Sequence, residues 1–241
     1  KKTKVIIPVH LNGRGADICA IREIAIENNI KVVEDAAQAL GSKNAYGYLG
    51  TQSDVGCFSL SVTKIISTGQ GGFVVTKDQE LDEKLRAIRT HGVENVTNPR
   101  NWGVPGFNFR ITDIQAAIGL TQLEKIDERI ETLKHIYSMY INSFKDYPDI
   151  KPIPVSLETG EVPVYNEFLC SNREDLIEEM DRCNIGLRPF VPNLARARYL
   201  KGIDASFPNS SQYGTNGLTL PSGPGQSVES VELVIDKIKM F

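Results

Sequence analysis

The chain has 241 residues, of which 41% are hydrophobic and 24% are charged, and its formal net charge at pH 7 is −3. This composition is ordinary for a globular protein with one large domain, or with one large and one small domain. The small net charge gives no electrostatic reason to expect a nucleic acid or an anionic membrane surface as a partner, and no apolar run predicts a transmembrane helix. The four cysteines show no CxxC spacing, so we expect reduced thiols in a cytoplasmic protein, without a disulfide framework or a metal site.

The first 35 residues predict a strand, a helix and a second strand. Residues 5–9 form an apolar run typical of a buried strand, and residues 30–33 form another. Between them, Asp17 is a good N-cap for a helix over residues 18–28. This βαβ pattern predicts a parallel sheet. Asp35 would then follow the carboxyl end of a parallel strand, where open α/β sheets bind ligands, although a role in a turn or a helix cap is the alternative.

A single lysine lies between two apolar runs in residues 54–76. The alternation in residues 55–62 predicts a strand with two different faces, and the glycine-rich run 67–72 predicts a tight loop before a further strand. Lys64, near the end of the first strand, either extends into water, as most lysines do, or is held in a pocket. A lysine removed from water loses its proton readily and can form a covalent link with a carbonyl group.

The rest of the chain predicts more helices and then a second, smaller domain. Helices are expected over residues 80–90, after a cap at Asp78, and from Thr112 onward with a bend or break near residues 122–125. Prolines and a glycine that follow Tyr147 mark the expected domain boundary. Beyond it we expect a strand over 162–170, a helix that begins with a capping box at Ser171–Glu174, a strand over 185–189, a long loop to Leu218 and a final helix over 227–239.

Several motifs occur together and in a fixed order over residues 4–130. They are Asp35-Ala36-Ala37-Gln38, Phe58-Ser59 with Thr63-Lys64, Thr68-Gly69-Gln70-Gly71-Gly72, Ile88-Arg89-Thr90-His91-Gly92, Gly106-Phe107-Asn108-Phe109-Arg110 and Asp113-Ile114-Gln115-Ala116-Ala117. With these motifs the chain resembles the DegT/DnrJ/EryC1/StrS family of pyridoxal-phosphate-dependent sugar aminotransferases. The rest of the chain resembles the family more loosely.

The resemblance implies an α/β fold of the fold-type I class. A large domain with a mostly parallel sheet would cover residues 1–147, and a small α+β domain would cover residues 148–241. Compared with the family, the chain looks as if its N-terminal third were absent, so the large domain would be partial. The missing part would hold the first strands, a phosphate-binding turn and the aromatic residue that stacks on the cofactor ring.

The resemblance also implies roles for individual residues. Lys64 would hold pyridoxal 5′-phosphate covalently and then move a proton, while Asp35 would keep the pyridine nitrogen of the cofactor protonated. Gln38 would contact the ring or its phenolic oxygen, and Ser59 would donate a hydrogen bond to the phosphate. Asn108 would reach the cofactor phosphate of the neighbouring subunit.

Three further residues are candidates for contact with the substrate. Arg110 suits a substrate phosphate, because a guanidinium group binds phosphate oxygens in a bidentate manner. Gln70 stands where the family usually has glutamate, a change expected to alter how the sugar is recognised. His10 follows another strand and is more simply a structural histidine, with a substrate contact as the alternative.

The predicted function is transfer of an amino group, from glutamate, onto a keto-sugar that is linked to a nucleotide. The resemblance implies a homodimer with shared active sites, in which the apolar loop 102–109 crosses to the neighbouring subunit; the alternative is that this loop folds back on its own domain. Two alternatives within the family are a sugar dehydratase and a non-catalytic regulatory protein. The dehydratases replace the lysine with histidine, so Lys64 argues against the first. An NAD-dependent oxidoreductase is disfavoured because no GxGxxG motif follows a strand.

Overall fold

The computed structural model describes residues 2–98, 100–200 and 206–241, and it divides into two compact units. The first unit runs up to Glu128 and also contains Ser156–Val162; the second contains Arg129–Val155 and Pro163–Phe241. The change of unit therefore comes earlier than the boundary that the composition predicts at Tyr147. The reason is that helix α4 (Ile126–Phe144) contributes its buried side chains to the core of the second unit.

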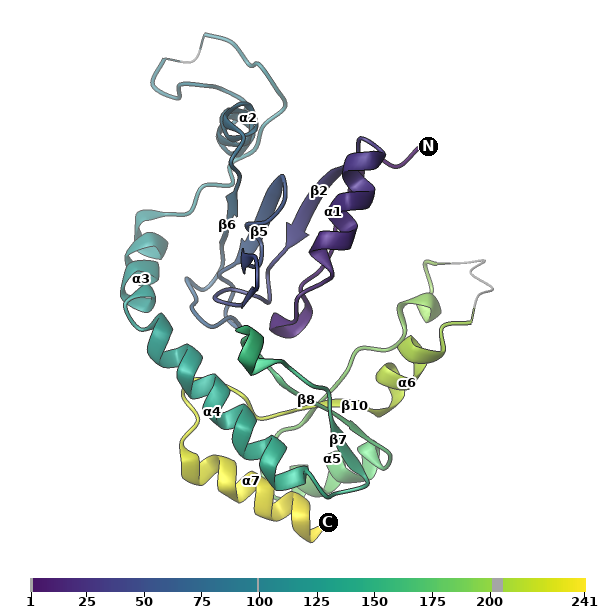
Figure 1. Cartoon of the computed structure of the whole chain (residues 1–241). Coiled ribbons are helices and arrows are strands. Elements are labelled where there is room, and N and C mark those ends of the chain that lie inside the picture. Colours follow the sequence, from purple (N-terminus) through teal and green to yellow (C-terminus); the bar gives the residue numbers. More distant parts are fainter. Residues whose placement is uncertain (1, 99, 201–205) are drawn as a thin grey trace. The chain divides into compact units, whose positions relative to one another are not determined.

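The first unit is built on a four-stranded sheet, whose longer strands are labelled in Figure 1. Its strands are β1 (Val5–Ile6), β2 (Lys31–Asp35), β5 (Val55–Ser59) and β6 (Gly72–Val75), in the order β1-β2-β5-β6. The pairs β1/β2 and β2/β5 are parallel, and β5/β6 is antiparallel. The expected α/β class with a mostly parallel sheet is therefore confirmed.

Helix α1 (Ile18–Glu27) connects β1 to β2 and covers one face of the sheet. Oδ1 of Asp17 accepts a hydrogen bond from the backbone N of Ala20 at 3.1 Å, which confirms the predicted N-cap. Ile18 packs with Val32 of β2 in a buried cluster. The βαβ prediction is thus confirmed, because a right-handed crossover helix buries its apolar side on the strands that it connects.

The opposite face of this sheet is open in the described part of the chain. Val9, Asp35, Cys57 and Val74 lie across from one another in successive strands, so their side chains share this face. Val9 is 48% exposed, and Val5 and Ile7 on the same edge are also exposed. The expectation of a buried strand over residues 5–9 is therefore wrong on this face. The side chain of Asp35 lies on the same open face.

Strand β5 ends at Ser59, earlier than the alternation over residues 55–62 predicts. The chain then turns, with the backbone N of Lys64 donating to the carbonyl of Ser61 at 3.1 Å. The glycine-rich loop that follows is confirmed, since Gly69 and Gly71 have positive φ angles of 82° and 141°. Lys64 consequently lies in a turn beyond the strand, where β5 has already stopped pairing.

The segment Ser156–Val162 is attached to the first unit by side chains and backbone. Oγ of Ser42 accepts from the backbone N of Val162 at 3.0 Å, and Oε1 of Glu161 accepts from the backbone N of Gly15 at 2.9 Å. The remaining elements of this unit are η1 (Leu11–Gly13), β3 (Lys43–Asn44), β4 (Gly47–Tyr48), α2 (Gln79–Arg89), α3 (Asp113–Leu123) and η2 (Leu157–Thr159). The expected caps at Asp78 and Thr112 are both present, and α3 and α4 confirm the predicted break near residues 122–125.

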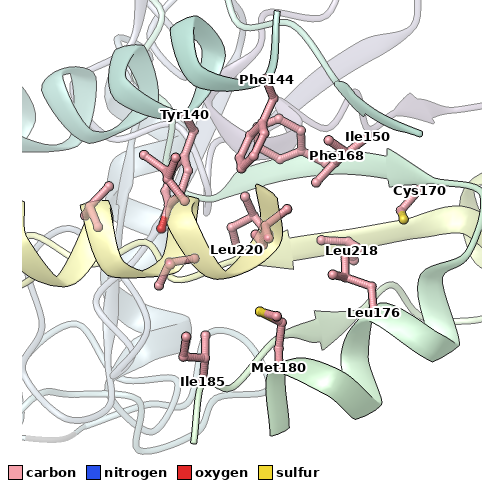
Figure 2. Packing of buried hydrophobic residues seen from close by; sticks show 14 of the residues in the cluster. Tyr140, Phe144, Ile150, Phe168, Cys170, Leu176, Met180, Ile185, Leu218 and Leu220 are labelled. Atoms are coloured by element: carbon pink, nitrogen blue, oxygen red, sulfur yellow. The ribbon is translucent and has the colours of Figure 1, made fainter. Parts of the chain in front are cut away.

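The second unit packs helices on an antiparallel sheet. The strands are β7 (Ile150–Pro152), β8 (Asn166–Cys170), β10 (Gly217–Leu220) and β9 (Arg188–Pro189), in the order β7-β8-β10-β9. Figure 2 shows side chains of α4 and α5 (Arg173–Arg182) around the strand residues of the core. Helix α7 (Val228–Met240) adds four buried residues to the same cluster.

Two predictions about this second unit are wrong. The expected capping box at Ser171–Glu174 is absent, because α5 begins after Asn172 and no side chain accepts a hydrogen bond there. The long loop expected up to Leu218 instead contains η3 (Leu194–Arg196), helix α6 (Pro208–Asn216) and the first two residues of the central strand β10, while its residues 201–205 lie outside the described part of the chain. The sequence of α6 is polar with a glycine, so it has no clear apolar periodicity to reveal a helix.

Strand β5 needs a glycine at position 56, because its backbone there lies very close to the backbone of Gly50. A Cβ added to Gly56 of β5 would lie 1.6 Å from the carbonyl oxygen of Gly50, whereas one added to Gly103 would meet nothing within 4 Å. We therefore expect Gly56→Ala to lower the melting temperature by about 6–12 °C, corresponding to about 3 kcal/mol of overpacking, and Gly103→Ala to change it little. Thermal unfolding followed by circular dichroism measures both. An equal effect of the two variants would contradict this account of the contact.

Candidate functional site

The predicted site residues follow the carboxyl ends of two neighbouring parallel strands. Asp35 is the last residue of β2, and Ser59 is the last residue of β5. Gln38 lies three positions beyond Asp35, and the half-buried Lys64 lies in the turn after Ser59. These four residues thus lie at or shortly after the carboxyl edge of the sheet, which is where open α/β sheets bind their ligands.

One oxygen of the Asp35 carboxylate accepts a hydrogen bond from the loop that follows it, and the other oxygen accepts none within the described residues. Oδ1 accepts a hydrogen bond from the backbone N of Ala37 at 3.0 Å. Oδ2 has no partner among the residues that the structure describes. Cys57 lies beside Asp35 on β5; burial raises the pKa of its thiol, and the charge of Asp35 raises it further. The neighbour of Asp35 is therefore an uncharged thiol, and Oδ2 can bind a cationic N–H group.

Gln38 is oriented by a hydrogen bond from another loop. Its Oε1 atom accepts from the backbone N of Asn12 at 3.0 Å. An amide side chain has one acceptor end and one donor end, so this contact leaves the Nε2 group of Gln38 to donate to a ligand. The amide therefore suits an anionic oxygen, such as a phenolate.

Ser59 and the glycine-rich loop form the polar rim of the site. Oγ of Ser59 lies 3.2 Å from Oγ of Ser61 and accepts from the backbone N of Ser61 at 3.3 Å. In the loop, the carbonyl of Gln70 accepts from Oγ1 of Thr68 at 2.7 Å and from Nε2 of Gln115 at 2.9 Å. The side chain of Gln70 itself is exposed, so the main chain shapes the loop and the predicted substrate residue is left facing water.

His10 is a buried structural residue in this structure, and its partner is Glu34. Both side chains are 0% exposed, and Nε2 of His10 lies 2.9 Å from Oε2 of Glu34. Nδ1 of His10 accepts from the backbone N of Ala16 at 3.1 Å. Both ring nitrogens are therefore occupied, which leaves none for the substrate contact considered from the sequence. Glu34 was not identified as a functional candidate, because a polar residue in an apolar strand gives no sign of which distant residue it meets.

Glu34 remains a carboxylate although it is buried. Burial raises its pKa, but hydrogen bonds from His10, Ser53 and the backbone of Gly50 and Gln52 outweigh burial, so its pKa lies below the usual value. Several donors to one carboxylate stabilise the charged form in this way.

Asn108 and Arg110 lie on a separate, exposed segment between α2 and α3. Asn108 forms an isolated β-bridge with Thr90, and its Oδ1 accepts from Nε of Arg110 at 2.9 Å. Nη2 of Arg110 lies 3.5 Å from Nε2 of His91, a residue held at a φ of 59°. Within the described residues, no hydrogen bond joins Asn108 or Arg110 to the four residues at the sheet edge.

Two other classes of site receive no support. In the described ranges, no group of three or more His, Cys, Asp and Glu side chains could hold a metal ion. No helix in the same ranges is both long enough and apolar enough to cross a bilayer.

Comparison with known proteins identifies the relatives of this chain. It is 34% identical over 242 residues to GDP-perosamine synthase from Caulobacter vibrioides, a match that covers 97% of this chain and 65% of the relative. A DegT DnrJ EryC1 StrS aminotransferase from Brucella abortus superposes with a TM-score of 0.90 at 27% identity, covering 99% of this chain and 64% of that one. An E. coli GDP-4-keto-6-deoxy-D-mannose-3-dehydratase with bound hydrated PLP superposes with a TM-score of 0.84 at 25% identity. This match covers 98% of this chain and 67% of that one.

The chain thus spans about two thirds of the length of these relatives. The model of the DegT/DnrJ/EryC1/StrS aminotransferase family matches residues 1–239, which is nearly the whole chain. With this match and the shared fold, the chain belongs to the DegT/DnrJ/EryC1/StrS aminotransferase family.

Proposed function

We propose that this chain provides the cofactor site of a pyridoxal-phosphate-dependent aminotransferase that acts on a nucleotide-linked keto-sugar, with glutamate as the amino donor. The observation that supports this most is the placement of Asp35, Gln38, Ser59 and Lys64 at the carboxyl ends of β2 and β5. The similarity to a GDP-perosamine synthase supports a sugar nucleotide as the substrate class.

The chemical groups at the sheet edge fit this cofactor. The free oxygen of Asp35 suits a protonated ring nitrogen, the Nε2 group of Gln38 suits the phenolic oxygen, and the hydroxyl of Ser59 suits the phosphate. Lys64 supplies the amine that holds the aldehyde. When bound, the cofactor supplies an electron sink that stabilises negative charge on the carbon next to the reacting nitrogen.

The residues of the chain then perform the remaining tasks. Asp35 keeps the ring nitrogen protonated, because a carboxylate beside a basic nitrogen favours the charged form. Lys64 would take a proton from the carbon that carries the amino group, as a general base, and would give a proton to the carbon on the other side of that nitrogen, as a general acid. A lysine at this position also favours transfer over dehydration, since the dehydrating branch of the family is characterised by histidine there.

The loop at residues 102–109 supports a shared active site in a homodimer. Trp102 is 78% exposed, and the stacked rings of Phe107 and Phe109, with centroids 5.0 Å apart, belong to residues that are 56% and 66% exposed. Exposed aromatic groups of this kind are typical of surfaces that bind a partner. We propose that a second copy covers this loop, and that Asn108 and Arg110 reach its cofactor phosphate and substrate phosphate.

We also propose a cytoplasmic location. All four cysteines are free thiols in the structure, which is the usual state in a reducing compartment.

Lys64 is expected to be the residue that links to the cofactor. Protein incubated with pyridoxal 5′-phosphate and reduced with borohydride should carry the label on the peptide that contains Lys64. The label should disappear in Lys64→Ala and persist in the control Lys77→Ala, because Lys77 is an exposed residue outside the sheet edge. Peptide mapping by mass spectrometry identifies the labelled residue, and a label on another lysine would refute the assignment.

Asp35→Asn is expected to retain the covalent link but to lower turnover by about a hundredfold or more. The link requires only Lys64, whereas catalysis requires a protonated ring nitrogen. Asp54→Asn is the matched control, because Asp54 bonds Lys31 and the backbone of Val32 away from the sheet edge. Steady-state kinetics with glutamate and a keto-sugar nucleotide compares the two. Near wild-type turnover of Asp35→Asn would show that another group protonates the ring.

Complementation tests the shared site. Lys64→Ala protomers and Asn108→Ala/Arg110→Ala protomers are each expected to be inactive alone. After subunit exchange in an equal mixture, half the dimers are mixed and each has one intact site, so activity should return to about one quarter of the wild-type value. If exchange is confirmed by mass spectrometry and no activity returns, each chain builds its own site.

A further inference from the structure

The buried carboxylate of Glu34 connects its own strand β2 to the segment at His10 and to the loop at Gly50–Ser53. Its two oxygens accept hydrogen bonds from Nε2 of His10 at 2.9 Å, from the backbone N of Gly50 at 2.8 Å and Gln52 at 2.7 Å, and from Oγ of Ser53 at 2.8 Å. A buried charge is tolerated only when hydrogen bonds replace its water, so these segments cannot move independently of Glu34.

The hydrogen bonds also fix the protonation of His10. The backbone N–H of Ala16 donates to Nδ1, so this nitrogen carries a lone pair and no proton. The single ring proton is therefore on Nε2, where it is donated to Glu34. His10 is neutral, and the pair retains the full negative charge of Glu34.

This pair is connected to two residues of the proposed cofactor site, directly to Asp35 and through the neighbouring Asn12 to Gln38. The backbone N of His10 donates to the carbonyl of Asp35 at 3.0 Å, and the nearby Asn12 donates to Oε1 of Gln38 at 3.0 Å. Glu34 precedes Asp35 in β2, so the two side chains point to opposite faces of the sheet. Holding Glu34 on the α1 face therefore directs Asp35 to the open face.

We propose that Glu34 and His10 form a positioning pair that orients the carboxylate of Asp35 and the amide of Gln38 toward the cofactor. The pair lies behind the site and touches neither cofactor nor substrate. This inference rests on the proposed function, because the pair would orient residues toward a cofactor. The hydrogen bonds of the pair exist in the protein without cofactor, so their effect on Asp35 and Gln38 can be tested in the cofactor-free protein.

Two substitutions of His10 separate positioning from general stability. His10→Gln retains an N–H group that reaches Glu34 but loses the acceptor for Ala16. His10→Asn retains an acceptor in place of Nδ1 but is too short to reach Glu34. Each variant loses one buried hydrogen bond, so both should melt at lower temperature, as should Tyr137→Phe, a control that loses the buried hydrogen bond to Val155 in the second unit.

The first measurement uses cofactor-free protein and nuclear magnetic resonance. We expect His10 to be the neutral Nε2–H form. We also expect the backbone amide of Asp35 and the side-chain amide of Gln38 to shift in His10→Asn, but to remain near their wild-type positions in His10→Gln and Tyr137→Phe. A doubly protonated His10, or equal shifts in both His10 variants, would overturn the proposal even if the protein bound no cofactor.

The second measurement is the affinity for pyridoxal 5′-phosphate, from an absorbance titration. We expect His10→Asn to bind about tenfold more weakly or worse, and His10→Gln to stay within about threefold of wild type. Equal affinities would show that the pair stabilises the fold only. A wild-type protein that binds no cofactor would refute the proposed function, and the resonance measurement alone would then decide the positioning role.

Discussion

The first unit depends on the need to satisfy one buried carboxylate. Glu34 has no contact with water, and a neutral histidine cannot cancel its charge, so N–H and O–H donors must surround it. The loop at Gly50–Ser53 supplies three of those donors, and Gly56 allows that loop to lie directly on β5. The hydrogen bonds to Glu34 therefore link β2 to the loop that lies on β5, in addition to the parallel ladder that joins the two strands.

The two faces of β2 carry different kinds of carboxylate. Glu34, on the face of α1, is fully bonded and has a lowered pKa, so it has no capacity left for a ligand. Asp35, on the open face, has one bonded oxygen and one that remains available. Strand geometry alone separates these roles, since consecutive residues of a strand point in opposite directions.

Much of the fold and part of the site could be predicted from the sequence. The cap at Asp17, the βαβ unit and the break between α3 and α4 rest on local signals within a few residues, and the structure bears them out. The contact of His10 with Glu34 joins residues 24 positions apart, and nothing local to either residue indicates it. Strand β10 was missed for a similar reason, because its four residues are stabilised by pairing with β8 and β9 and by the core. The roles assigned to Lys64 and Asp35 came from motif resemblance, and their chemistry stays a prediction.

The open sheet face affects how a polypeptide of these 241 residues behaves in water. Strand β1 is the edge strand of this sheet, its Val5 is exposed, and so are Ile7 and Val9 directly after it. Edge strands with apolar side chains pair readily with other chains. A preparation of this chain by itself should therefore become turbid as its concentration rises, and agents that coat apolar surfaces, such as mild detergents, should keep it clear.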